Sequence, residues 1–223
     1  SPLTGGNQSA IFDGAWDYLL VSNPEDFDLG NKSFTIDTWV KFSNVTGTQT
    51  IEEKFTGSQD GYSWYLNDGY LTFYADHNTV AMYSPNRLSA NTWYHIAIVR
   101  DGVNFKQFIN GKLQESLGDC WVTGAGISNQ ASPLRVGSRN GTGSSLSAQI
   151  DEFRISQGIA RWTSNFTPPA DEYTEDLCTT LLLHFNNYHY KTIRTAYTTA
   201  AQGNTTQTVT DSLGLLRQAT KDS

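Results

Sequence analysis

The amino-acid sequence predicts an all-β fold in which two antiparallel sheets pack face to face as a jelly-roll sandwich. Three observations lead to this prediction. Short runs of alternating apolar and polar residues recur along the chain, and turn dipeptides such as Asn110-Gly111 separate them. No span carries a helical apolar stripe over several turns. The 223 residues, of which 38% are hydrophobic and 13% aromatic, suffice for one substantial core.

The clearest strand signal lies in residues 93–117. Its first run is apolar on both faces, as expected for a central strand that is covered on both sides. Asp101-Gly102 and Asn110-Gly111 supply the positive φ angles of tight hairpin turns. The sequence therefore predicts a three-strand meander at 93–100, 103–109 and 112–117.

Similar patterns predict the remaining strands, roughly nine or ten in all. They comprise 34–42, a hairpin around Asn67-Asp68-Gly69, 134–138, 148–156 and 179–185. We expect residues 10–186 to form the sandwich, with "TTLLLHF" (179–185) pairing beside "SAIFDG" (9–14), because short apolar strands at the ends of a domain need backbone partners.

The composition changes near residue 187. Residues 187–223 contain no Trp, Phe or Cys and are dominated by Thr, Ala, Asn and Gln, so they cannot bury a core of their own. We expect a domain at 1–186 and a polar C-terminal tail at 187–223 that acts as an arm held by a neighbouring chain, with "NTTQTVT" adding to that chain's sheet edge. The alternative is that the tail folds back over its own sandwich. The side chains expected to contact the partner are Tyr188, Tyr190, Ile193, Tyr197, Val209, Leu213, Leu215 and Leu216.

Charge and cysteine usage exclude several functional classes. The formal net charge of −7 argues against nucleic-acid binding, which needs a basic face. No run reaches the roughly 18 apolar residues of a membrane span, so no membrane insertion is expected. Cys120 and Cys178 lie far apart, and one long-range disulfide and two free thiols both remain open.

Several segments together resemble the laminin-G-like, concanavalin-A-like jelly rolls. "AIFDGAWDYLLVSNPEDFDLGNKSFTIDTWVKF" resembles the opening strands of that family, "NTWYHIAIVRDGVNFKQFINGKL" its central meander, and "LRVGSRNGTGSSLSAQIDEFRIS" its closing hairpin. The following "GIARWTSNFTPP…LLLHF" is similar to versions common in tailed-phage and other virion proteins. The resemblance covers roughly 10–186 and implies two curved antiparallel sheets.

Catalysis is not expected. Sandwich glycosidases need two carboxylates placed across one sugar, and the related glucanases carry Glu-x-Asp-x-(x)-Glu on a concave strand. The chain has no such pattern, and the adjacent Glu52 and Glu53 are expected to point to opposite faces of a strand.

We expect either no cofactor or one structural calcium. The histidines show no metal-binding spacing. In the glucanases that the chain resembles, an acid on the final strand helps to hold calcium, and here that acid is Asp151, with Asp13 or the carbonyl of Gly14 beside it. The alternative is that Asp151 accepts a hydrogen bond from a turn.

Aromatic side chains on or near the 60–85 hairpin, one turn and one Gly-rich loop are candidate sugar contacts, because flat apolar rings with polar edges suit sugars. Ordinary surface aromatics are the alternative. The candidates are Trp16, Tyr62, Trp64, Tyr74, His77, Tyr83 and Trp121.

These features favour a non-catalytic interaction or structural module on a virion surface, such as phage head decoration or a tail fibre, or on another extracellular surface. Its expected partners are protein neighbours in a homo-oligomer or virion lattice, with a cell-surface glycan as a further ligand. The alternative function is a lectin-like carbohydrate-binding adhesin domain, and a glycoside hydrolase ranks last.

Overall fold

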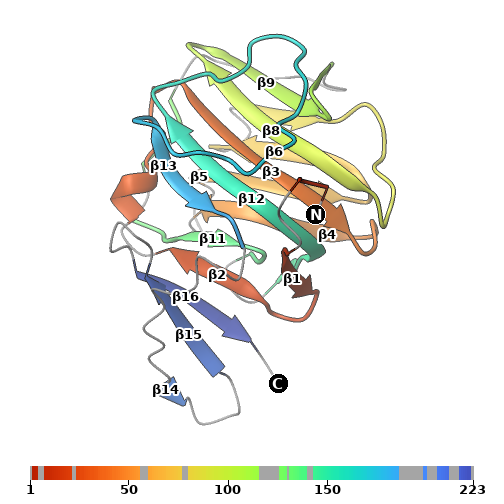
Figure 1. Cartoon of the computed structure of the whole chain (residues 1–223). Coiled ribbons are helices and arrows are strands. Elements are labelled where there is room, and N and C mark those ends of the chain that lie inside the picture. The colour runs from red at the N-terminus through yellow and green to blue at the C-terminus, as the bar shows by residue number, and fades with distance from the viewer. Residues whose placement is uncertain are drawn as a thin grey trace.

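The structure is a computed structural model of the chain. It describes residues 2–4, 8–21, 24–55, 60–76, 80–115, 126–129, 131–139, 143–185, 198–199, 205–210 and 216–221. Two antiparallel sheets pack face to face (Figure 1), which confirms the predicted sandwich. Within these residues no helix has the length and apolarity of a membrane span.

Sheet A has the central strand order β1-β12-β3-β8-β9-β10, and β13 also pairs with β12. Its strands are β1 (Ala10–Asp13), β3 (Phe34–Phe42), β8 (Trp93–Asp101), β9 (Asn104–Ile109), β10 (Lys112–Gln114), β12 (Ser147–Gln157) and β13 (Thr179–Leu183). The meander predicted from the two Gly turns is β8-β9-β10, and it forms because Gly102 and Asn110 adopt positive φ angles of 61° and 50°.

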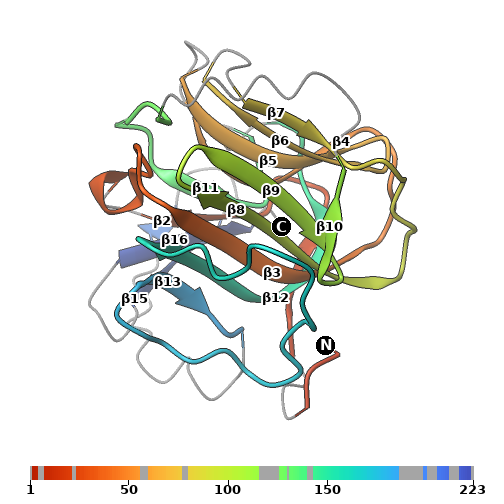
Figure 2. The same ribbon diagram turned by 90° about the horizontal axis from the view of Figure 1, so that it is seen from above.

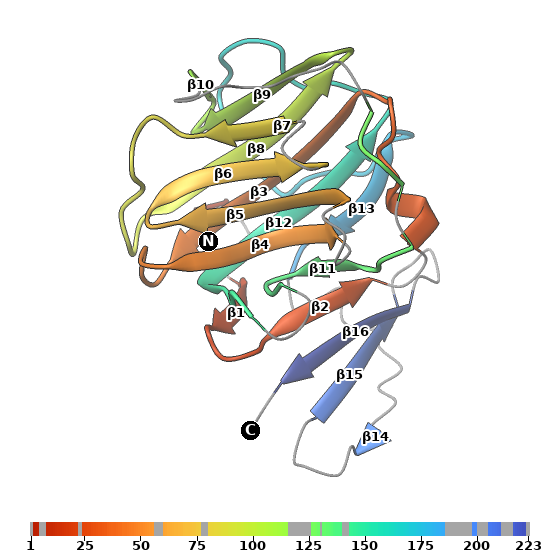
Figure 3. The ribbon, with the colours of Figure 1, turned by 180° about the vertical axis from the view of Figure 1, so that it is seen from behind.

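Sheet B has the order β14-β15-β16-β2-β11-β4-β5-β6-β7 and faces the viewer in Figure 3. Its strands are β2 (Tyr18–Val21), β4 (Thr48–Phe55), β5 (Gly61–Asn67), β6 (Tyr70–Ala75), β7 (Val80–Tyr83), β11 (Leu134–Val136), β14 (Thr198–Thr199), β15 (Thr205–Thr210) and β16 (Leu216–Lys221). A 3-10 helix, η1 (Pro24–Phe27), follows β2.

The inner faces of the two sheets form one hydrophobic core. Trp64 and Phe73 from sheet B and Ile98 and Phe153 from sheet A are fully buried in it. Because successive side chains of a strand point to opposite faces, the residues between these positions point outward. The two outer faces are therefore where the sheets differ.

The outer face of sheet A is covered by its own chain. Residues 158–178, here called the strap, cross that face between β12 and β13 (Figure 2). A second, smaller apolar cluster forms between the strap and sheet A. Sheet A contributes Ala97, Val99 and Phe108, and the strap contributes Ala160, Trp162 and Phe166. Trp162 and Phe166 stack with ring centroids 4.0 Å apart, and the N–H of Phe166 donates to the carbonyl of Gly111 at 2.9 Å.

The expected pairing of 179–185 beside the first strand is wrong in detail. β13 pairs with β12 at Phe153–Ser156, whereas β1 pairs with β12 at Ser147–Ile150. The two short strands therefore lie end to end along the same edge of β12. The physical reason is that β12 has eleven residues, and this edge is long enough for both.

The tail strands pair within their own chain. β16 adds to β2, with Arg217 opposite Val21, and β15 and β14 follow outward. This pairing corresponds to the alternative in which the tail returns to its own sandwich, and it gives the backbone of β2 a second neighbour. Contact of the tail with another chain stays a prediction.

Most of the predicted partner contacts cannot be placed. Tyr188, Tyr190, Ile193, Tyr197, Leu213 and Leu215 lie outside the described residues. For Val209 and Leu216, the structure describes the backbone, in β15 and β16, but not the side chain.

Gly111→Ala is expected to destabilise the fold more than Gly102→Ala. Both glycines have positive φ, at 71° and 61°, so either substitution strains the backbone, by about 1 kcal/mol. A Cβ at Gly102 would meet nothing within 4 Å, whereas a Cβ at Gly111 would lie 1.9 Å from the carbonyl oxygen of Phe166. Urea unfolding of both variants measures the difference. Equal losses would show that the strap does not pack closely on this turn.

Truncation after Asn187 is expected to leave a folded sandwich, because the described core residues all precede that position. If a neighbouring chain holds the tail, full-length protein forms an oligomer and the truncated chain is monomeric by light scattering. Monomers in both cases would rule out the partner contact. Loss of cooperative unfolding on truncation would instead show that β16 is needed to stabilise β2.

Candidate functional site

Two of the predicted aromatic ligand contacts lie inside the sandwich. Tyr62 and Trp64 are 1% and 0% exposed, so neither is available to a ligand, and this expectation is corrected. The reason is the alternation along β5, which turns Tyr62, Trp64 and Leu66 toward the core and leaves Ser63 and Tyr65 on the outer face. The side chains of β5 that reach the outer face are therefore the neighbours of the predicted ones in sequence.

The remaining aromatic candidates are divided between several places. Tyr74 and Tyr83 lie on the outer face of sheet B, where Tyr83 is 37% exposed. Trp16 is exposed in the turn between β1 and β2, where its φ is 76°. Its backbone N–H donates to Ser145 Oγ at 3.2 Å. His77 and Trp121 lie outside the described residues.

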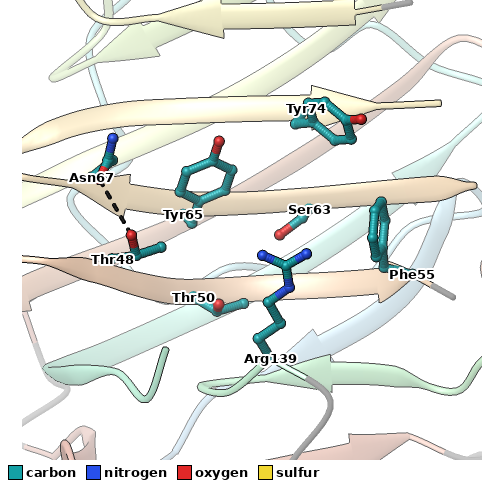
Figure 4. A pocket seen from close by; sticks show the side chains of 8 residues that line it. All are labelled: Thr48, Thr50, Phe55, Ser63, Tyr65, Asn67, Tyr74 and Arg139. Carbon is teal, nitrogen blue, oxygen red and sulfur yellow. Dashed lines mark hydrogen bonds between the residues drawn. The ribbon is translucent and has the colours of Figure 1, made fainter. Parts of the chain in front are cut away.

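A pocket of about 380 Å³ opens on the outer face of sheet B (Figure 4). Three neighbouring strands and the residues after β11 contribute its side chains. Its lining residues are Thr48, Thr50 and Phe55 from β4, Ser63, Tyr65 and Asn67 from β5, Tyr74 from β6, and Arg139. Tyr74 is the only residue of this set that the sequence analysis had chosen.

Strand register brings these side chains together. Thr48 lies opposite Asn67, and Ser63 lies opposite Tyr74, so each pair projects from the same face. Thr48 Oγ1 donates to Asn67 Oδ1 at 3.2 Å. The rings of Phe55 and Tyr74 meet edge to face with centroids 6.0 Å apart. The pocket floor is therefore a continuous polar and aromatic surface across three strands.

Arg139 reaches the pocket from a short loop. Its guanidinium carbon lies 5.6 Å from the centre of the Phe55 ring, which is only 5% exposed. Two backbone hydrogen bonds join Arg139 and Gly143, and the next residue, Ser144, accepts a hydrogen bond from the N–H of Thr50 at 2.8 Å. The loop that carries the cation is thus attached to a strand of the pocket.

The chemistry of the pocket is that of a binding surface. Burial raises the pKa of Tyr65 to about 12, so its hydroxyl remains a hydrogen-bond donor at neutral pH. Hydroxyl, amide and guanidinium groups surround two tyrosine rings, a combination that suits a polyhydroxylated ligand with an apolar ring face. The lining residues that the structure describes include no Asp or Glu for acid–base chemistry.

A second polar cluster lies beneath the strap on sheet A. Arg154 donates two hydrogen bonds of 3.0 Å to the buried Asp37 carboxylate. His95 Nε2 lies 3.5 Å from the same carboxylate and 2.9 Å from the Tyr173 hydroxyl. Burial alone would raise the pKa of Asp37, but His95 and Arg154 lower it below its ordinary value. Because all four side chains are buried, we assign this cluster to holding the strap.

Glu152 extends the same network toward β13. Its carboxylate accepts a hydrogen bond from the N–H of Tyr173 at 2.7 Å and lies 2.8 Å from His184 Nδ1. The hydrogen bond with Glu152 raises the pKa of His184 above its ordinary value. His95 and His184 thus both have hydrogen-bonding partners within the fold.

The predicted calcium ligands do not come together. Asp13 pairs with Ser147, whereas Asp151 lies four residues further along β12, about 13 Å away at the rise of a strand. Oδ1 of Asp13 accepts from the N–H of Ala15 in the turn that contains Gly14, and Oδ1 of Asp151 accepts from the N–H of Glu152. The calcium proposal is therefore corrected in favour of the hydrogen-bonding alternative. In the described part of the chain, no group of His, Cys, Asp and Glu is placed to hold a metal.

The expectation that Glu52 and Glu53 point to opposite faces of β4 agrees with their partners. Glu52 lies opposite Trp64, which points into the core, and Glu53 lies opposite Ser63, which lines the outer pocket. Both glutamates are 0% exposed. Lys54, on the same inner face as Glu52, forms an ion pair of 2.6 Å with Asp28. The inner face of sheet B thus carries polar groups within the core, which sequence periodicity did not predict.

Glu52→Gln is expected to remove a pH-dependent loss of stability. Burial raises the pKa of Glu52 in the folded protein well above its ordinary value of 4.5. The unfolded chain therefore releases this proton at a lower pH than the folded chain. Ionisation of Glu52 therefore lowers the free energy of unfolding of the wild type as the pH rises from 4.5 to the folded-state pKa of Glu52.

Urea unfolding of wild type and variant between about pH 4 and pH 8 measures this effect. The stability of Glu52→Gln relative to wild type should increase with pH. The same substitution at the exposed Glu25 is the control for the loss of one carboxylate charge. A difference between Glu52→Gln and wild type that does not change with pH would contradict the assignment.

Comparison with known proteins agrees with the fold. A family model, Laminin_G_3, described as the concanavalin A-like lectin/glucanases superfamily, matches residues 13–161. No curated protein sequence matches the chain at a significant level.

Two solved structures have similar folds. A protein from Bacteroides ovatus described as a candidate carbohydrate-binding protein matches with a TM-score of 0.68 and 16% identity, over 96% of this chain and 58% of that one. The CBM40 of the IT-sialidase of Ruminococcus gnavus matches with a TM-score of 0.53 and 16% identity, over 70% of this chain and 93% of that one. At these identities the likeness shows the fold, and this chain spans little more than half of the Bacteroides protein.

Proposed function

This chain belongs to the concanavalin A-like lectin/glucanases superfamily, and from that premise we propose that it is a non-catalytic carbohydrate-binding module. The pocket on the outer face of sheet B is its binding site. The observation that carries the proposal is the set of side chains there, in which Tyr65 and Tyr74 stand among hydroxyl and amide groups from three strands. Such a surface can pack against the apolar face of a sugar while bonding its hydroxyls.

The difference between the two outer faces supports this location. The strap covers the outer face of sheet A, where the polar cluster around Asp37 is buried. Sheet B carries an open pocket at β4–β6. A ligand that approaches this sandwich meets accessible aromatic and polar groups on sheet B.

The similar folds favour the lectin-like alternative of the sequence analysis. The Bacteroides protein is described as carbohydrate-binding, and the Ruminococcus domain is a CBM40. The virion role expected from the resemblance of the strap region gains no support from these comparisons, and neither does assembly into a lattice. Binding of a glycan at an extracellular surface is therefore the function that we put forward.

Replacing Tyr65 or Tyr74 with Ala is expected to weaken glycan binding about fivefold, because each ring contributes on the order of 1 kcal/mol to an aromatic contact. A glycan array followed by calorimetry on the best ligand measures the loss. Trp93→Ala on sheet A is the matched control and should bind as wild type does. Trp16→Ala tests the site expected from the sequence.

Two results would count against the proposal. If the wild type binds no glycan on the array, the proposed carbohydrate-binding function is wrong. Loss of binding in Trp16→Ala with normal binding in both tyrosine variants would place the site at the turn between β1 and β2.

A further inference from the structure

The pocket contains one charged side chain that the other lining groups do not neutralise. Arg139 is exposed, and the other lining residues in the described part of the chain are Thr, Ser, Asn, Tyr and Phe. The whole protein has a formal net charge of −7. The pocket therefore presents a local positive charge on an acidic protein.

A buried carboxylate, that of Glu53, lies on the same face of sheet B as the pocket. Glu53 points to the same side of sheet B as Ser63 but is 0% exposed and does not line the pocket. Arg135 lies directly opposite Glu53 on β11, so this carboxylate has a cation on the neighbouring strand. Arg139 is the cation that a ligand in the pocket would meet.

The guanidinium is held in a definite orientation. It packs over the Phe55 ring at 5.6 Å, and Figure 4 shows it extending across β4 toward Ser63, between Phe55 and Tyr65. Backbone hydrogen bonds join Arg139 to Gly143, and the N–H of Thr50 donates to the carbonyl of Ser144. The guanidinium group is planar and carries its N–H donors along its edge, and that edge matches the two oxygens of a carboxylate.

We propose that the pocket selects an acidic sugar, one that carries a carboxylate, as uronic and sialic acids do. The carboxylate accepts paired hydrogen bonds from Arg139, and the sugar ring packs against Tyr65 and Tyr74. Hydroxyls of Thr50 and Ser63 donate to oxygens of the sugar. Thr48 Oγ1, whose hydrogen goes to Asn67, accepts from a sugar hydroxyl. This inference rests on the proposed function, since it names the class of sugar that the same pocket takes.

The test uses the full-length chain on an array in which each acidic glycan stands beside its neutral parent. The acidic members carry a uronic acid, a sialic acid or a sulfate ester, and the ligand with the strongest signal is then measured by calorimetry. The wild type should bind carboxylate-bearing glycans at least about tenfold more tightly than their parents, and this preference should fall as NaCl is raised.

Arg139→Gln and Arg139→Lys separate charge from geometry. Both should fold as the wild type does, because the side chain is exposed, and thermal unfolding checks this. Arg139→Gln should lose the preference for the acidic member, so that each acidic glycan and its neutral parent bind with about the same affinity. Arg139→Lys should recover only part of it, because an ammonium group cannot bond both oxygens in the same way.

Each contrary outcome has a distinct meaning. Equal binding of acidic and neutral members, unchanged in Arg139→Gln, would overturn the inference and leave the proposed function intact. A preference for sulfate esters alone would overturn the carboxylate assignment. Failure of the wild type to bind any glycan would overturn both.

Discussion

The architecture depends on an irregularity in β12 at Glu152. This residue has a φ of +52°, and the register of β12 with β3 shifts between Asp151 and Arg154. At the same place the other edge of β12 changes its partner from β1 to β13. A bulge that bends a strand and redirects its side chains is consistent with all three observations. The bulge lies between the stretch of β12 that pairs with β1 and the stretch that pairs with β13.

The same irregularity organises the outer face of sheet A. The Glu152 carboxylate bonds the backbone of Tyr173 and contacts His184, while Arg154 pairs with Asp37 and lies 4.2 Å from the Tyr173 ring. These contacts hold the strap over sheet A, so polar groups that resemble catalytic machinery in composition are closed off. Buried ion pairs of this kind specify an arrangement more than they stabilise it. The strap covers the outer face of sheet A, and the open pocket lies on the outer face of sheet B.

Local signals in the sequence predicted local structure well. Asp101-Gly102, Asn110-Gly111 and Asp68-Gly69 each mark a turn whose backbone angles only a few residues tolerate, and all three hairpins are present. Pairings between segments that are distant in the sequence were harder to predict. The pattern of 179–185 indicates a strand but does not name its partner, and adjacency to β1 along β12 cannot be derived from either segment alone. Tyr62 was misplaced because a strand's apolar face and its ligand face differ by one residue. Arg139 lies in a loop without a periodic pattern, so only the folded register brings it to Phe55.

The alternation along β5 has a consequence for how this module can change over evolutionary time. Trp64 and Leu66 secure the fold from one side of the strand, and Ser63, Tyr65 and Asn67 line the pocket from the other. Substitutions at the outward positions change the chemistry of the pocket while leaving the inward packing in place. The chain can therefore change the groups that the pocket presents through a few surface substitutions, without first gaining extra stability to offset them.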